Sequence, residues 1–336
     1  MLFSLKVLVL SAISCAYVQG EATPSCPDPV AISPCTCLLV SENLHLDCSS
    51  VASEEELETA LRAEFPTKDF YLFGIYNNPN LKVIHKGIFH DLTFQVIEMK
   101  VGYLEEIEAG AFTGSALTLQ EINLFNNEIR SFPFEEIESY LKLLSLEMTY
   151  NNVSSFPVIK SSTLQTLDLS KNPLMSFPAD GLQHLPSLVN AMFQSCEISE
   201  VFSGTFAGLP SLNYVTLFSN NISFIPTNFI ELHGEGAYVY LGINHIDTIE
   251  VGAFKGVSRV FDIDYNSLKT VEEEIWRPVL EAGAGLYLVG NPFECGSDIN
   301  WLIQEPKFMK LLDPYAACAN GTLLSDLQPP LWRGRY

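Results

Sequence analysis

The chain has 336 residues, in which 18 lysines and arginines face 40 aspartates and glutamates, so the formal net charge is −22. This acidic balance excludes a nucleic-acid binder and electrostatic docking on an anionic membrane, because both need clustered cations. Hydrophobic residues at 47% and aromatic residues at 11% suffice for a core and exclude a disordered chain.

Residues 1–20 have the pattern of a secretory signal peptide. Lys6 is the only charged residue of this segment, and an apolar run from Val7 to Ala16 follows it. Val18 and Gly20 are suitable residues for positions −3 and −1 of a cleavage site. No later apolar run is long enough to predict a membrane span. We therefore expect a secreted, extracellular protein in a compartment that permits disulfides.

Residues 21–66 predict a cysteine-rich N-terminal cap. Its four cysteines are Cys26, Cys35, Cys37 and Cys48. Four cysteines allow three pairings, and the residues alone do not choose between them. A zinc site is the rival interpretation, but the signal peptide and the lack of Cys-x-x-Cys spacing favour disulfides.

A short acidic helix is predicted over Ser53–Phe65, beside this cap. Ser53 and Glu56 have the spacing of a capping box, and Leu57 and Leu61 lie on one helical face. The glutamates are expected to form a solvated first turn that matches the helix dipole.

Residues 67–290 repeat the pattern Leu-x-x-Leu-x-Leu-x-x-Asn-x-Leu, in which other apolar residues replace some leucines. The segments Leu119–Ile129, Leu164–Leu174 and Leu212–Ile222 fit it fully. The Asn position, here called the ladder position, recurs every 21–25 residues at Asn78, Gly102, Asn127, Asn151, Asn172, Cys196, Asn220, Asn244, Asn266 and Asn291. This motif at this period indicates leucine-rich repeats. The predicted fold is an α/β solenoid, a curved horseshoe of about ten repeats with a parallel sheet on its concave face and disulfide-tied caps.

The residue types of the repeat have physical reasons. Neighbouring coils must stack to bury the apolar edge of each strand, and a ladder Asn can pair backbone groups that would otherwise be buried unpaired. The returning segments contain Phe89, Phe112, Phe206 and Phe254, which we expect to fill the outer half of the core.

Cys196 is the odd cysteine of the repeats. A reactive or intermolecular thiol is one hypothesis. However, the repeat consensus accepts Cys in place of Asn at the ladder position, where a buried thiol is inert. The structural interpretation is therefore preferred.

Residues 291–336 predict a C-terminal cap and tail. The segment Asn291–Ile303 opens the cap with Cys295, and Cys318 follows it. A solenoid end exposes an apolar cross-section, which a disulfide-tied cap can cover.

No motif for catalysis is found, and no enzyme activity, metal or cofactor is expected. The chain has no zinc-protease, nucleophile-elbow, phosphate-loop or dinucleotide motif. Asp262 and Asp264 lie on one strand face and could hold Ca²⁺, but no further acids flank them, so a solvated pair is preferred.

Three sequons predict a glycoprotein, at Asn152, Asn221 and Asn320. Asn152 and Asn221 each follow a ladder Asn directly, so both should emerge at the same turn edge, where glycans would shield one flank.

The caps carry a closer resemblance. The opening CPDP…PCTC, the helix SEEELETAL, the start GIYNNPNL, the cap NPFEC…DINWLI and the ending CANGTLLSDL resemble the arthropod family named for the oplophorus-luciferin 2-monooxygenase non-catalytic subunit. The resemblance implies a non-catalytic partner of a small secreted oxygenase. The alternative is an extracellular matrix or innate-immunity protein that recognises a protein or a microbial surface.

The cap cysteines also resemble those of secreted leucine-rich repeat proteins. This resemblance implies the pairs Cys26–Cys37 and Cys35–Cys48, with Cys295–Cys318 at the other end. The C-terminal cap departs from the usual pattern, because Ser297 stands where a second cysteine is common and one downstream cysteine is missing. One disulfide of the cap is therefore expected to be absent.

Strand side chains alternate between faces, so the residues between the inward leucines should line the concave sheet. This face is acidic in the middle and aromatic towards the C-terminus, and the predicted partner-binding residues are Glu98, Phe125, Glu147, Asp168, Tyr214, Phe218, Tyr238, Tyr240, Asp262, Asp264 and Tyr287. Clustered exposed aromatics anchor many protein interfaces. We expect an extracellular protein partner with a basic patch and an apolar ridge. The alternative remains open that the acids only keep the protein soluble and that the aromatics only cover neighbouring strands.

Overall fold

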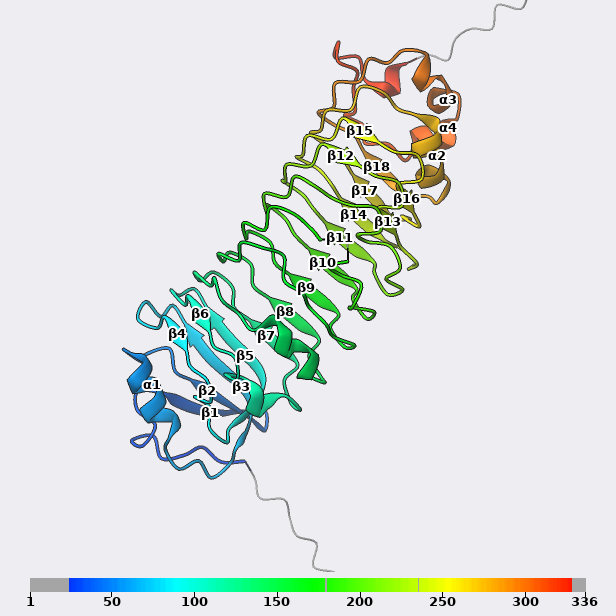
Figure 1. The fold of residues 1–336 in the computed structure, drawn as a ribbon. Coiled ribbons are helices and arrows are strands. Elements are labelled where there is room, and N and C mark those ends of the chain that lie inside the picture. The colour runs from blue at the N-terminus through cyan, green and yellow to red at the C-terminus, as the bar shows by residue number, and fades with distance from the viewer. Residues whose placement is uncertain (1–23, 179, 235, 328–336) are drawn as a thin grey trace, which may run out of the picture.

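Each coil of the chain adds one short strand to a single 12-stranded sheet. The computed structural model describes residues 24–178, 180–234 and 236–327, so the predicted signal peptide over 1–20 lies outside the described residues. The strands lie side by side along an elongated solenoid, with one cap at each end (Figure 1). Strands β1 and β2 are antiparallel, and every later neighbour joins in parallel.

The main sheet has a fixed order along the solenoid. Its strands are β1 (Thr36–Val40), β2 (Asn43–Asp47), β3 (Asp69–Tyr76), β5 (Thr93–Lys100), β7 (Glu121–Asn123), β8 (Ser145–Glu147), β9 (Thr166–Asp168), β10 (Asn190–Met192), β11 (Tyr214–Thr216), β14 (Tyr238–Tyr240), β17 (Val260–Asp262) and β18 (Gly285–Tyr287). Since β1 and β2 belong to the same sheet, the N-terminal cap continues directly into the repeats.

The returning segments form shorter elements. The paired strands are β4 (Val83–Ile84) with β6 (Glu106–Ile107), β12 (Phe224–Ile225) with β15 (Thr248–Ile249), and β13 (Ile230–Glu231) with β16 (Phe254–Lys255). The helices are α1 (Glu54–Leu61), α2 (Glu273–Glu281), α3 (Asn300–Ile303) and α4 (Pro306–Met309), with 3-10 turns η1 (Thr113–Ser115), η2 (Phe134–Ser139), η3 (Ser297–Ile299) and η4 (Leu324–Asp326). None of the helices in the described ranges is long and apolar enough to cross a membrane.

The core runs the whole length of the stack. The middle residue of each main-sheet strand from β7 to β18, such as Ile122, Leu167 or Val239, is fully buried. The return-segment phenylalanines Phe89, Phe112, Phe206 and Phe254 are at most 5% exposed, as the sequence predicts. Full burial of one such side chain contributes about 1.5–3 kcal/mol relative to exposure.

The ladder residues link each coil to the one before it. Asn220 shows the pattern: its Nδ2 donates to the carbonyls of Phe193 and Leu217, both at 2.8 Å, while its Oδ1 accepts from the N–H groups of Cys196 and Ile198. Buried backbone groups of two coils are thereby paired. Such bonds join Asn127, Asn151, Asn172, Asn244, Asn266 and Asn291 to preceding coils.

The two exceptions at the ladder position have different local explanations. The buried Cys196 thiol donates to the Leu169 carbonyl, with Sγ 3.3 Å from the oxygen, and so replaces one donor of an Asn amide. At Gly102 a Cβ atom would lie 2.7 Å from Asn127 Oδ1, so the amide of the next coil occupies the space of a side chain.

In each coil the chain turns at the residue before the ladder position, whose backbone adopts the left-handed conformation. Its φ is 53° at Asn77, 57° at Asn126, 59° at Val101 and 53° at Ile243. Asn adopts this conformation readily, whereas the β-branched Val101 and Ile243 are strained there. The stacking of neighbouring coils therefore holds some turns against their local preference.

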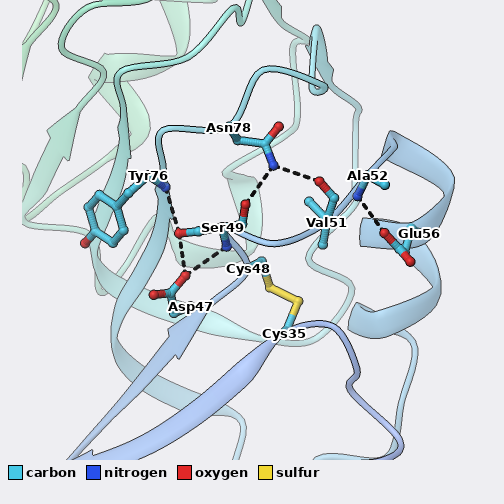
Figure 2. Close-up of a disulfide and its surroundings, with 9 residues drawn as sticks. All are labelled: Cys35, Asp47, Cys48, Ser49, Val51, Ala52, Glu56, Tyr76 and Asn78. Carbon is cyan, nitrogen blue, oxygen red and sulfur yellow. Dashed lines mark hydrogen bonds between the residues drawn. A yellow bond between two sulfur atoms is a disulfide. The ribbon is translucent and has the colours of Figure 1, made fainter.

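The N-terminal cap is tied by two disulfides, Cys26–Cys37 and Cys35–Cys48, the pairing implied by the resemblance. Figure 2 shows Cys35–Cys48 beneath the first coil, where Asn78 Nδ2 donates to the carbonyls of Ser49 and Val51 at 2.9 and 2.8 Å. The first repeat is thus hydrogen-bonded directly to the cap.

Helix α1 covers this cap but is shorter than predicted, since it ends at Leu61 rather than Phe65. Ser53 caps the Glu56 N–H as expected, but the returning Glu56 carboxylate accepts from the Ala52 N–H, one residue before the cap (Figure 2). The prediction that the glutamates are merely solvated is wrong for Glu54, which accepts hydrogen bonds from the N–H groups of Lys82 and Val83. Glu54 therefore attaches the helix to the first repeat.

The last coil returns as α2, a helix absent from the sequence predictions. Ile275, Trp276, Val279 and Leu280 recur at helical spacing and are buried, and the Trp276 ring lies 5.4 Å from that of Phe261. This amphipathic pattern predicts an α-helix, although the segment lies within the repeats, where the other coils return without one.

The C-terminal cap contains the single disulfide Cys295–Cys318. The Trp301 indole N–H donates to the Val271 carbonyl at 2.8 Å, and the Arg277 guanidinium lies 5.3 Å from the Trp301 ring centroid and 5.4 Å from that of Phe308. These contacts hold the cap against α2 where the usual second disulfide is absent.

Candidate partner-binding face

The open sheet face is formed by the side chains that alternate with the buried ones on the main strands. Its central row follows the strand register from Gly74 through Glu98, Asn123, Glu147, Asp168, Met192, Thr216, Tyr240 and Asp262 to Tyr287. The repeat phase predicts this same row. Parallel strands lie about 4.8 Å apart, so neighbouring side chains of the row can contact one another.

Glu98 lies in the N-terminal part of this row and already has partners within the chain. Tyr76 Oη donates to its Oε2 at 2.5 Å, and Lys100 Nζ lies 2.7 Å from its Oε1. Burial, followed by the hydrogen bond to Glu98, raises the pKa of Tyr76 above its usual range, so this phenol remains a donor. The Glu98 carboxylate is therefore partly neutralised before any partner arrives.

Glu147 and Asp168 form the acidic middle of the face. Asn123 Nδ2 donates to Glu147 Oε2 at 2.5 Å, and the Ser170 N–H donates to Asp168 Oδ1 at 2.8 Å. Burial raises the pKa of Glu147, and the charges of Glu121 and Asp168 add to this effect while Lys100 opposes it. A cation brought here by a partner would relieve the repulsion between these carboxylates.

The aromatic half of the face is a contiguous cluster. The ring centroid of Tyr214 lies 5.5 Å from that of Tyr240 and 6.3 Å from that of Tyr238, and the Arg259 guanidinium lies 5.5 Å from the Tyr238 ring. These phenols are half-buried, and burial raises the pKa of both Tyr214 and Tyr240. Cross-strand packing thus presents a rigid aromatic surface rather than separate mobile rings.

The predicted set contains three further aromatic residues, of which only Phe218 and Tyr287 belong to the C-terminal half of the face. Phe218 is half-buried against Gly242, and Tyr287 on the last strand is 40% exposed. Phe125 lies towards the other end and contacts Tyr150, with ring centroids 5.7 Å apart. The predicted residues therefore form two aromatic groups separated by the acids, not one.

Asp262 and Asp264 lie next to the aromatic cluster and are half-buried rather than fully solvated. The Asp264 N–H donates to Asp262 Oδ1 at 2.9 Å, and the Val289 N–H donates to Asp264 Oδ1 at 2.5 Å. Burial, together with the charge of Asp262, raises the pKa of Asp264 to about 6. The pair fastens the turn after β17, and no group of three or more metal-ligating side chains occurs among residues 24–178, 180–234 and 236–327.

The predicted modification sites lie outside this face. Asn152, Asn221 and Asn320 are all exposed. The backbone N–H groups of Asn152 and Asn221 donate to Ile129 and Ile198, which are equivalent positions of their preceding coils. These two sequons therefore emerge at the same edge of the solenoid.

Sequence reasoning missed several members of the surface. Lys100, Arg259 and the exposed aromatics Tyr150 and Tyr265 contribute charge or ring area. Tyr150 and Tyr265 occupy the left-handed position before the ladder residue, which the alternation rule for strands does not cover. The repeat spacing could have located both tyrosines, because each directly precedes a ladder residue.

Comparisons with known proteins agree with this architecture. The family model described as Leucine Rich Repeat matches residues 163–185. The chain is 35% identical to the Oplophorus-luciferin 2-monooxygenase non-catalytic subunit of Oplophorus gracilirostris over 324 residues, which cover 94% of this chain and 90% of that protein. It is 24% identical to lumican of Coturnix japonica over 258 residues, covering 74% of this chain and 65% of lumican.

A solved structure shows the same fold. A chain of the octameric complex of Latrophilin 3, Unc5D and FLRT2 superposes with a TM-score of 0.64 at 21% identity, and the match covers 77% of this chain and 81% of that chain. Likeness at this identity concerns the fold alone.

Proposed function

The chain belongs to the family of the Oplophorus-luciferin 2-monooxygenase non-catalytic subunit, and on that premise we propose that it is a secreted scaffold that binds a protein partner across its open sheet face. It is a leucine-rich repeat protein and not an enzyme, because this relative is named as a non-catalytic subunit and the fold characteristically serves binding. The proposed role is to hold a partner in a fixed position.

The packed aromatic cluster carries this proposal. Tyr214, Tyr238 and Tyr240 are half-exposed, contact one another and lie on the two neighbouring strands β11 and β14. Because their rings are already ordered, a partner would lose little side-chain entropy on binding them. Tyrosine-rich surfaces of this kind supply many of the anchors of protein interfaces.

The charges define the chemistry of the partner. Glu147 and Asp168 lie on the same face as the cluster, and burial with mutual repulsion disfavours the ionised form of Glu147. A basic patch would pair with these acids while an apolar ridge covers the tyrosines. The net charge of −22 would also steer a cationic partner towards the chain.

The named relative suggests the class of this partner. We propose a small secreted oxygenase, by analogy with the complex that the relative's name implies. The arthropod origin and the secretion of the chain are parts of the same proposal. A matrix or innate-immunity role remains the alternative, and it requires the same face to bind a different extracellular protein or a microbial surface.

The test is capture from the native extracellular fluid with the purified chain as bait. A parallel bait with Phe218→Ala and Tyr240→Ala distinguishes the open sheet face from other surfaces. An oxygenase that is captured by the parent and lost with the double variant supports the proposal. If matrix proteins or microbial glycans are captured by the parent and lost with the double variant, the alternative is favoured. Equal capture by both baits excludes the open sheet face as the binding surface.

A further inference from the structure

A row of three hollows runs along one flank of the solenoid, on the segments that follow the ladder residues. Their volumes are about 400, 490 and 530 Å³. The first two share Ser154 and Ser155, and the second and third share Glu200 and Phe202. We call this row the flank groove.

The flank groove exposes apolar side chains on segments outside the strands of the open sheet face. Val158 is 68% exposed, Met175 57% and Phe224 42%, and the half-buried Phe156 and Phe202 line the same hollows. Serines such as Ser155 and Ser176 lie between these side chains, so the groove offers both apolar surface and hydrogen-bonding groups to an occupant.

Two sequons border this groove. Along 152–154 the side chains alternate exposed, buried and exposed, so Asn152 points to the same side as Ser154, which lines the first two hollows. Asn221 is related in the same way to Ser223, which lines the third hollow. A sugar attached at either Asn would therefore begin at the rim of the groove.

We propose that the flank groove is the packing site of the chain's own N-linked glycans at Asn152 and Asn221. The inference rests on the proposed secretion, because glycans are added in the secretory pathway. There the Asn Nδ2 loses a proton and bonds to the anomeric carbon of a lipid-diphosphate-linked oligosaccharide, whose diphosphate leaves. The C–H faces of sugars pack on phenylalanine, methionine and valine side chains, while their hydroxyls hydrogen-bond to the groove serines.

Met175 reports occupancy of the groove, because it lines the middle hollow and its thioether oxidises when exposed. The full chain is secreted from cultured eukaryotic cells and treated with dilute hydrogen peroxide, and sulfoxide at Met175 is followed by mass spectrometry. We expect several-fold faster oxidation in the Asn152→Gln/Asn221→Gln variant than in the parent. The matched control Asn320→Gln removes a sequon in the C-terminal cap and should leave the rate unchanged.

Enzymatic deglycosylation of the folded parent gives a second measurement that needs no substitution. It should accelerate Met175 oxidation while leaving Met192, on the open sheet face, unaffected. Unmodified Asn152 and Asn221 in the secreted chain, or equal Met175 rates with and without glycans, would overturn the glycan packing and leave the partner face untouched. Failure of the folded chain to reach the medium would instead contradict the proposed secretion, and with it this inference.

Discussion

The phenol of Tyr76 donates to the carboxylate of Glu98 across neighbouring strands, with the two oxygens 2.5 Å apart. The Tyr76 ring can reach this position because Gly74 has no side chain, and a Cβ there would lie 2.6 Å from the ring. With Lys100 also paired to Glu98, this carboxylate is already used within the chain. We therefore expect Glu147 and Asp168 to carry most of the attraction for a basic partner.

Replacement of Glu147 by Gln and Asp168 by Asn should slow association with the partner several-fold at low salt, since steering depends on surface charge. The effect should diminish as salt rises, because the Debye length is only about 8 Å at physiological ionic strength. Stopped-flow or surface-plasmon measurements over a salt series would detect this. The control Glu135→Gln/Glu138→Gln makes the same charge change off the face, and an equal effect there would mean that net charge alone steers the partner.

Replacement of Phe218 and Tyr240 by Ala should weaken partner binding by about 2–4 kcal/mol, as loss of interface anchors does. The loss should appear mainly as faster dissociation. Both side chains are only half-buried in the free chain, so the unfolding temperature should change little. Undiminished affinity in the double variant would place the interface on another surface.

Asp264→Asn should stabilise the protein at pH 7.5. The folded-state pKa of Asp264 is raised to about 6 from an ordinary value of 3.8, chiefly by burial. The folded chain thus binds this proton more tightly than the unfolded chain, so its stability rises as pH falls from above 6 towards 4. Because the group is partly solvated, the gain at pH 7.5 should be about 1 kcal/mol.

Thermal unfolding at several pH values tests this prediction. The difference between Asp264→Asn and the parent should be largest above pH 6 and should vanish near pH 4. A gain that persists unchanged at pH 4 would show that the amide acts through new contacts rather than through the lost charge.

Cys196 should resist thiol reagents in the folded protein. Burial raises the pKa of this thiol to about 12, and its Sγ donates to the Leu169 carbonyl. Reactive thiolate is therefore scarce at neutral pH and inaccessible. Maleimide labelling in buffer and in denaturant compares the two states, and rapid labelling of the native chain would contradict the structural role of this cysteine.

Ile243→Asn should raise stability by about 1 kcal/mol, because a β-branched residue at a φ of 53° is strained and Asn tolerates this conformation. The Ile243 side chain is 46% exposed, so little packing is lost. Val251→Asn is the control, since Val251 is also exposed but has no left-handed backbone. Denaturant unfolding should show a gain for the first variant alone.

The phase of the repeat in the sequence was sufficient to predict much of the fold and the row of side chains on the open sheet face. A strand alternates its side chains locally, and stacking in register then places Glu147, Asp168 and Tyr240 in one row without further information. For the same reason the Asn at the ladder position predicted the hydrogen bonds that join the coils, and the adjacent sequons predicted a shared edge.

Tertiary structure decided how these side chains use one another. Tyr76 and Lys100 reach Glu98, and Glu54 reaches the backbone of Lys82, because coils distant in sequence lie within hydrogen-bonding distance. The flank groove likewise needs segments from several coils, Ser131, Ser154, Met175 and Phe224 among them. The repeat period predicts to which face of the sheet a side chain points. Whether its charge is paired and how far it is exposed depend on neighbours that only the packed solenoid brings together.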